Sequence, residues 1–259
     1  MSIATRPSAQ AAPETARATR YLRIFGTPVA LLGVVAALYL YVSAQDLDRI
    51  EQRSLNAEYL ISRTIQHLSL SAVVVVLVLV VAIPLGVVLT RPWAARAAGP
   101  VLTLANIGQA TPTFGLIVLF AVAFMTWGVH TIAIVAFWLY GILPVLRNTM
   151  VGLEQVDRSV VESARGMGMS RVRALTSVEL PLAVPVMLAG IRTALVVTVG
   201  TVALATFVGA GGLGDVINNG IISSRDTVLL TGSVLVAVLA LFIDWLAGLV
   251  EDLFRPKGV

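Results

Sequence analysis

The sequence predicts an all-α membrane protein with about six transmembrane helices. Of its 259 residues, 58% are hydrophobic and only 12% are charged, about half the charged share of a soluble domain. The charges gather between long apolar stretches, as expected of a chain that has lipid as its solvent. Because the basic residues behind the formal net charge of +4 flank these stretches, they indicate a membrane topology and not nucleic-acid binding.

Six apolar stretches are long enough, or nearly long enough, to cross a bilayer, which takes about 20 helical residues. The third contains Gly108, Pro112 and Gly115, and we expect it to break into two pieces. Membranes tolerate such a break only where the backbone faces protein or a wet cavity. The stretches run approximately over 28–44, 64–90, 100–126, 130–150, 183–208 and 227–250.

The basic residues predict which side each connection occupies. Thirteen of the 18 Lys and Arg residues fall on one side, four fall on the other, and Arg192 lies within the fifth stretch. The positive-inside rule therefore puts both termini and the 151–182 segment in the cytoplasm. The chain then divides into a disordered cytoplasmic tail over 1–27, a first transmembrane helix over 28–44, an extracytoplasmic loop over 45–63 and a transmembrane domain over 64–255.

The first apolar stretch has a second interpretation. Basic residues, an apolar run and then Val42-Ser43-Ala44 resemble a cleavable signal peptide. The apolar run is long for a signal peptide, which favours an uncleaved helix.

Residues 154–181 interrupt the apolar pattern with charged and small residues. Ser159 and Glu162 have the spacing of a capping box, in which each side chain bonds a free backbone N–H at a helix start. Gly166 and Gly168 weaken this helix and allow a turn, after which Ser170 can cap a second short helix. The first helix would carry an apolar face made of Val160, Val161, Ala164 and Met167. The segment therefore predicts two short amphipathic helices joined by a glycine turn.

The same segment resembles the EAA motif of ABC importer permeases, which reads Glu-Ala-Ala, then Gly after three further residues, then Ile-x-Leu-Pro after nine more. Ser163 replaces the second motif residue and Val178 replaces the Ile, and both changes are small. In that family the loop forms the coupling helix, which docks into a groove on the ATPase subunit. The resemblance assigns this role to Glu162, Ser163, Ala164, Met167, Gly168, Leu180 and Pro181. The alternative is an ordinary amphipathic helix lying on lipid headgroups.

Further segments are similar to those of glycine betaine, carnitine and choline permeases. They include 106–113, 143–149 and 164–169. Residues 190–193 and 207–215 match as well, although methionine permeases share a similar Gly-Gly-Leu-Gly-Asp. The resemblance covers about residues 62–255 and implies a type I ABC importer permease that takes up a quaternary-amine osmoprotectant. A permease for methionine or another small amino acid is the alternative.

Several residues are candidates for a substrate path or gate, namely Gln109, Thr111, Pro112, Thr113, Tyr140, Arg192 and Asp215. The alternative for those at the break is that hydroxyl and amide groups bond back to freed carbonyls or to neighbouring helices. The ring of Tyr140 can contact a quaternary ammonium, although an interfacial aromatic belt explains such residues as well. Arg192 is expected to face the bundle interior or to reach the cytoplasmic side. Asp215 follows a flexible glycine turn that is either part of a gate or a plain loop.

The chain has no phosphate loop of the form Gly-x4-Gly-Lys-[Ser/Thr], no catalytic constellation and no cysteine, and its two histidines lack metal-ligand spacing. The resemblance therefore implies a non-catalytic subunit of the bacterial inner membrane, with ATP and Mg bound by two partner ATPase subunits. It also implies a second permease, identical or homologous, and an extracytoplasmic substrate-binding protein.

A secondary transporter or channel is the alternative class, and it would need buried carboxylates or half-helix repeats. Only Asp244 suggests such a carboxylate, since Glu251 and Asp252 near the end of the last stretch are expected to be solvated.

Overall fold

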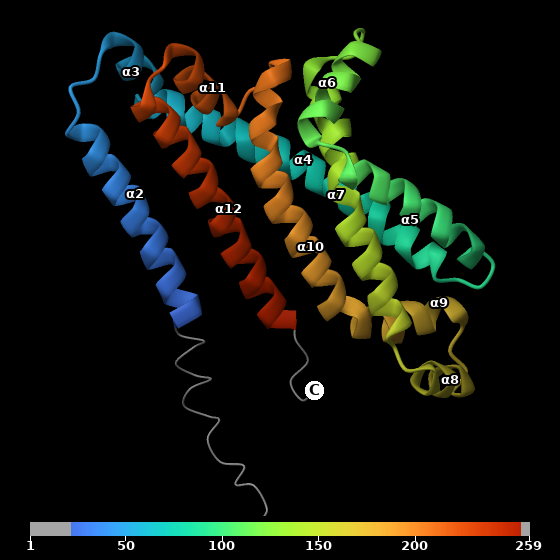
Figure 1. The fold of residues 1–259 in the computed structure, drawn as a ribbon. Coiled ribbons are helices and arrows are strands. Elements are labelled where there is room, and N and C mark those ends of the chain that lie inside the picture. The colour runs from blue at the N-terminus through green and yellow to red at the C-terminus, as the bar shows by residue number, and fades with distance from the viewer. Residues whose placement is uncertain (1–21, 255–259) are drawn as a thin grey trace, which may run out of the picture.

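The computed structural model describes residues 22–254, and every regular element in that part of the chain is a helix (Figure 1). Most of the tail predicted over 1–27, as well as Arg255 and Lys257, lies outside the described residues. In chain order the elements are the π-helical turn η1 (Leu22–Gly26), α2 (Thr27–Ser43), α3 (Arg49–Ser54), α4 (Ala57–Leu89), α5 (Ala95–Ala110), α6 (Thr113–Ala123), α7 (Val129–Glu154), α8 (Arg158–Gly166), α9 (Arg171–Ala174), the π-helical turn η2 (Leu175–Glu179), α10 (Leu180–Val202), the 3-10 helix η3 (Ala203–Val208), α11 (Gly214–Ser223) and α12 (Asp226–Phe254).

Within residues 22–254, five helical spans are long and apolar enough to cross a membrane, and α5 with α6 makes a sixth that is bent by 99°. The predictions of about six spans and of a break in the third are therefore confirmed. One of the five runs without a break from Arg171 to Val208. The second short helix predicted after the glycine turn, α9, is thus the beginning of the fifth span.

The segment predicted as a loop over 45–63 is partly helical, because α3 lies within it and α4 begins at Ala57. The Asn56 side chain caps α4 by accepting a hydrogen bond from the Tyr59 backbone N–H at 2.8 Å. Polar residues such as Glu58 and Arg63 extend α4 beyond its apolar part, so hydropathy alone placed the start of this helix too late.

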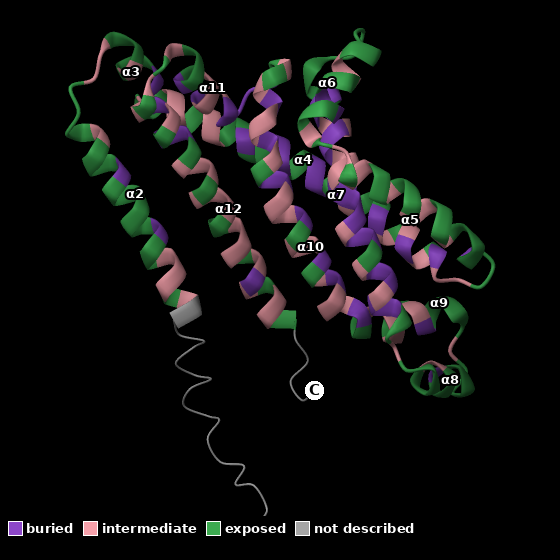
Figure 2. Cartoon of the chain, in the orientation of Figure 1, coloured by how far each residue is buried: buried purple, intermediate pink, exposed green. Residues whose placement is uncertain are grey.

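The helix α7 forms the centre of the bundle, where it packs against α4, α5, α6 and α10 (Figure 2). Small residues let these helices approach closely. A Cβ added at Gly190 of α10 would lie only 2.6 Å from the Pro144 carbonyl oxygen of α7. Contacts of this kind hold helices together in lipid, where the hydrophobic effect does not favour their association.

The helix α2 packs against α12 at the edge of the bundle. Trp245 of α12 donates its indole N–H to the Ile24 carbonyl at 3.2 Å. Of the α2 side chains, only Leu31 and Leu38 are buried, and the exposed remainder is as apolar as a lipid-facing helix requires.

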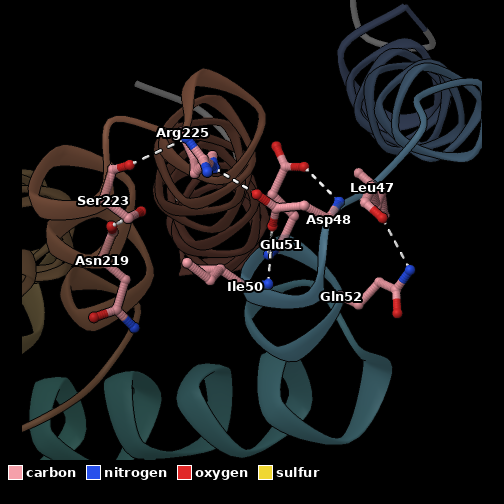
Figure 3. A network of polar contacts seen from close by, with 8 residues as sticks. All are labelled: Leu47, Asp48, Ile50, Glu51, Gln52, Asn219, Ser223 and Arg225. Carbon is pink, nitrogen blue, oxygen red and sulfur yellow. Dashed lines mark hydrogen bonds and ion pairs between the residues drawn. The ribbon is translucent and has the colours of Figure 1, made fainter.

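The two ends of the bundle differ. The helices α3 and α11 lie at one end of the bundle. The helix α8 lies at the other end, together with the N-terminal end of α2 and the C-terminal end of α12 (Figure 1). At the α3 end, Asp48 and Glu51 form a capping box, and Arg225 donates to the Asp48 carboxylate at 2.8 Å (Figure 3). The hydrogen bond from the Glu51 backbone N–H, with help from Arg225 and Ile50, holds the pKa of Asp48 below its ordinary value.

Candidate functional site

The helix α8 projects from the end of α7 and carries the first half of the motif residues (Figure 1). Its cap is Asp157, whose carboxylate accepts from the Ser159 backbone N–H at 2.8 Å. Hydrogen bonds from the Ser159 backbone and hydroxyl hold the pKa of Asp157 below its ordinary value. The predicted capping box of Ser159 with Glu162 is therefore wrong, because a carboxylate two residues earlier starts the helix.

Two of the four residues in the apolar face predicted for α8 are exposed. Ala164 is buried, with 3% of its surface exposed, but Val160 is 43% exposed and Met167 is 75% exposed. Val172, on the adjoining α9, is 71% exposed. Exposed apolar side chains gathered on a projecting unit indicate a surface that binds another molecule. Glu162 and Ser163 are exposed on the same helix.

A glycine turn joins α8 to α9 with defined backbone geometry. Gly168 has a φ of +90°, which side chains with a Cβ rarely adopt. Met169 donates its N–H to the Ala164 carbonyl at 3.2 Å, and Gly168 donates to the carbonyl three residues back at 2.9 Å, which together make a Schellman motif. Ser170 then caps α9 by accepting from the Arg173 N–H at 3.3 Å. The glycine turn and the Ser170 cap are confirmed.

The second half of the motif is tied to the bundle. Arg91, just after α4, forms an ion pair of 2.8 Å with Glu179, just before α10. Leu180 packs against a buried cluster that includes Leu153. Pro181 lies in the first turn of α10, where a proline is tolerated. Sequence reasoning missed the Arg91–Glu179 pair, for which the only signal was an acidic residue between two apolar ones.

The helix break occupies the predicted place, between α5 and α6. The Thr111 hydroxyl donates to the Ile107 carbonyl at 2.8 Å, so this side chain bonds back to its own helix. A Cβ at Gly108 would lie 3.2 Å from the Leu139 carbonyl oxygen, so the end of α5 before the break lies against α7. The other candidates here are half-buried or exposed, namely Gln109, Pro112, Thr113 and Tyr140.

The glycine turn before α11 is held by α4. Asp215 forms an ion pair of 2.8 Å with Arg63. The Gly212 N–H donates to the Gln66 side-chain oxygen at 3.4 Å, and φ is positive at Gly209, Gly211 and Gly212. Arg63 and Gln66 share one face of α4 with His67, at positions i, i+3 and i+4.

His67 is fully buried and links three segments. Its Nδ1 accepts from the Leu213 backbone N–H at 3.3 Å, so the ring proton lies on Nε2, which donates to the Val199 carbonyl at 2.8 Å. The residue therefore joins α4 to α10 and to the turn before α11. The spacing of the histidines gave no sign of this role.

Arg192 of α10 forms a bidentate ion pair with Asp244 of α12, with N–O distances of 2.6 and 2.7 Å. A third nitrogen donates to Glu251 at 3.3 Å. Glu251 was expected to be solvated, and this is wrong, because it lies two turns from Asp244 on the same face of α12. A Cβ at Gly248 would lie 3.4 Å from the guanidinium, so the glycine leaves room for it.

The candidate pathway residues thus fall in three separate places. The break follows the end of α5 that packs against α7 at Leu139, the residue before Tyr140. Asp215 pairs with α4, and Arg192 pairs with the C-terminal half of α12. Within residues 22–254, no group of three or more His, Asp or Glu side chains could hold a metal ion.

These features define a multi-pass helical membrane protein with an exposed two-helix unit at one end. The family described as binding-protein-dependent transport system inner membrane component matches residues 82–256, which is more than half of the chain. The chain belongs to this family and is the membrane-spanning permease subunit of an ABC importer. The helices α2 and α3 precede the matched residues.

The chain matches its relatives over nearly their full length. The chain is 39% identical over 205 residues to the glycine betaine/carnitine/choline transport system permease protein OpuCB of Bacillus subtilis, which covers 79% of this chain and 92% of that protein. It is 38% identical over 218 residues to the osmoprotectant import permease protein OsmW of Salmonella typhimurium, covering 82% and 100%. A chain of the MetNI methionine ABC transporter in inward-facing conformations matches with a TM-score of 0.67 at 25% identity, covering 76% and 96%. The predicted permease fold is confirmed.

Proposed function

We propose that this permease imports a quaternary-amine osmoprotectant, such as glycine betaine, choline or carnitine, by alternating access. The observation that carries the proposal is the similarity to relatives named for glycine betaine/carnitine/choline transport and for osmoprotectant import, at 38–39% identity over at least 92% of their length. The likeness to the methionine transporter chain is lower, at 25% identity, which disfavours the amino-acid alternative.

The exposed unit α8–α9 supplies the docking element for an ATPase. The ATPase, present in two copies, would bind ATP and Mg, while this chain contributes Glu162, Ser163 and Met167 to the contact. Because α8 packs against α9 and η2, which continue into α10 within one span, a displacement of α8 would pass into α10. In this arrangement the α8 end and both termini face the cytoplasm.

The opposite end, with α3 and α11, would receive the substrate-binding protein. A second permease, identical or homologous, would complete the pathway, which the break and Tyr140 would help to line. The ion pair of Asp244 with Arg192 disfavours a secondary transporter, because that carboxylate is already neutralised.

Uptake measured with the whole complex tests the substrate. Proteoliposomes that contain the permease, its ATPase and its binding protein, with ATP available to the ATPase, should accumulate labelled glycine betaine, choline or carnitine. Methionine serves as the competing substrate. Accumulation of methionine without any of the quaternary amines would overturn the proposal.

A further inference from the structure

An edge-to-face pair of phenylalanines stands where one span is broken and another passes from α-helix into 3-10 helix. The ring centroids of Phe114 and Phe207 are 4.9 Å apart, with an interplanar angle of 81°. Phe114 is in the first turn of α6, directly after the 99° break, and Phe207 is near the end of η3, where α10 stops being an α-helix.

Both rings point away from the packed interior. Leu116 and Ile117 of α6 and Ala205 of η3 fill the core of the bundle. Phe114 and Phe207 are left 49% and 50% exposed. The pair is therefore a surface available to something outside this chain.

Lipid does not suit this surface. The α5–α6 break lies within a span, and irregular backbone at membrane depth is tolerated only against protein or a water-filled cavity. The first N–H groups of α6 follow Pro112, which makes no side-chain cap.

The chemistry around the pair selects the kind of ligand. An aromatic face attracts a cation, and quaternary ammonium groups are the ligands most often recognised in this way. The helices α5, α6 and η3 contain no Asp or Glu. A zwitterion that carries its own carboxylate would therefore meet no fixed negative charge beside the rings. A weak site is also what a transport path needs, since the solute must leave it again.

We infer that Phe114 and Phe207 form a transient binding site for the quaternary ammonium group of the transported solute, by cation–π attraction. This inference rests on the proposed function, since a permease for another class of solute would have no such group to bind.

Ring fluorination tests the inference, because each fluorine weakens the negative face of the ring with little change in its shape. Phe114 and Phe207 are replaced in turn by mono-, di- and trifluorinated phenylalanine in the complete complex, in proteoliposomes with ATP. Uptake of labelled glycine betaine is measured with saturating loaded binding protein, so that the permease limits the rate. At one or both positions the rate should fall stepwise, by roughly two- to thirtyfold in all. Phe207→Trp should keep transport, and Phe207→Leu should lower it within the same two- to thirtyfold range.

The matched control is Phe242 of α12, which is 40% exposed and stacked near Trp245 at 5.7 Å. The same fluorinated residues there should leave uptake unchanged, and gel filtration checks that every complex assembles. Glycine betaine uptake that does not change with fluorination at either ring would overturn the inference while the proposed function stands. If the unmodified complex takes up no quaternary amine at all, the proposed function fails and this inference with it.

Discussion

Arg192 and Asp244 form a bidentate ion pair, in which two guanidinium nitrogens donate to the two carboxylate oxygens at 2.6 and 2.7 Å. Such bidentate pairs are among the strongest hydrogen-bonded contacts in proteins. Here the pair joins α10, the helix that follows the motif segment, to α12. Each side chain is about one-third exposed, so solvent screens the attraction between the two charges only in part.

Breaking this pair should destabilise the permease. We expect Asp244→Asn and Arg192→Gln each to lower the Tm of the complex in nanodiscs. The double-mutant cycle should give a coupling of about 0.5–3 kcal/mol. The exchange Arg192→Asp with Asp244→Arg should recover part of the loss. Additive effects of the two single changes would show that the pair contributes no interaction of its own.

The sequence predicted the features that depend on neighbouring residues. The turn at Gly168, the Ser170 cap and the break before Thr113 each follow from residue types within a few positions. The cap of α8 was misassigned because Asp157 and Ser159 both suit that role and lie two residues apart.

Contacts between distant helices escaped prediction for a physical reason. Arg192 and Asp244 are 52 positions apart, and Arg91 and Glu179 are 88 apart. Hydropathy shows that each is a charge near or within an apolar span, but it does not show which helix faces will meet. Contacts formed between two distant helices could therefore be identified only from the structure.

His67 should be needed for stability and not for metal binding. His67→Phe removes the acceptor of the Leu213 N–H and the donor to the Val199 carbonyl. Each buried group left unpaired costs about 1–3 kcal/mol, so the Tm should fall clearly. Ser71→Ala, on the next turn of α4, removes only a bond to its own helix and should have a smaller effect. Equal Tm values for these two variants would contradict the assigned role of His67.

The α3 end should loosen in acid. The folded-state pKa of Asp48 is below its ordinary value of 3.8, so its contribution to stability is complete above pH 3.8 and is lost as the pH falls through the folded-state pKa. Amide hydrogen exchange over 48–54 should therefore be flat from pH 7 to about pH 4.5, after correction for intrinsic rates, and lose protection below 3.8. Asp48→Asn should lack this acid transition, and an unchanged transition in that variant would place its origin elsewhere.

Both termini should lie on the cytoplasmic side. Thirteen of the 18 basic residues fall on that side in the predicted topology. The helix α8 lies at the same end of the bundle as the N-terminal end of α2 and the C-terminal end of α12 (Figure 1). A green fluorescent protein fused after Val259 should fluoresce, and alkaline phosphatase inserted between Gln45 and Asp46 should be active. Activity of a phosphatase fused after Val259 would reverse the topology.

Gly168 should be essential for coupling because of its backbone and not because of space. A Cβ there would meet nothing within 4 Å, but φ is +90°. A residue with a Cβ pays about 1–2 kcal/mol in a left-handed conformation, and this would reorient α8 relative to α9. Gly168→Ala and Gly168→Asp should therefore both weaken transport while the protein stays in the membrane. In both variants the ATPase should respond less to the loaded binding protein.

Gly166 provides the matched control, since it lies two residues away, has no neighbour within 4 Å and lacks a positive φ. Gly166→Ala favours the helix and should transport at nearly the wild-type rate. Co-purification of the ATPase separates a coupling defect from failed assembly. An amphipathic helix that merely lies on lipid headgroups would tolerate all three substitutions. Wild-type transport by Gly168→Asp in a correctly assembled complex would therefore refute the coupling role of α8.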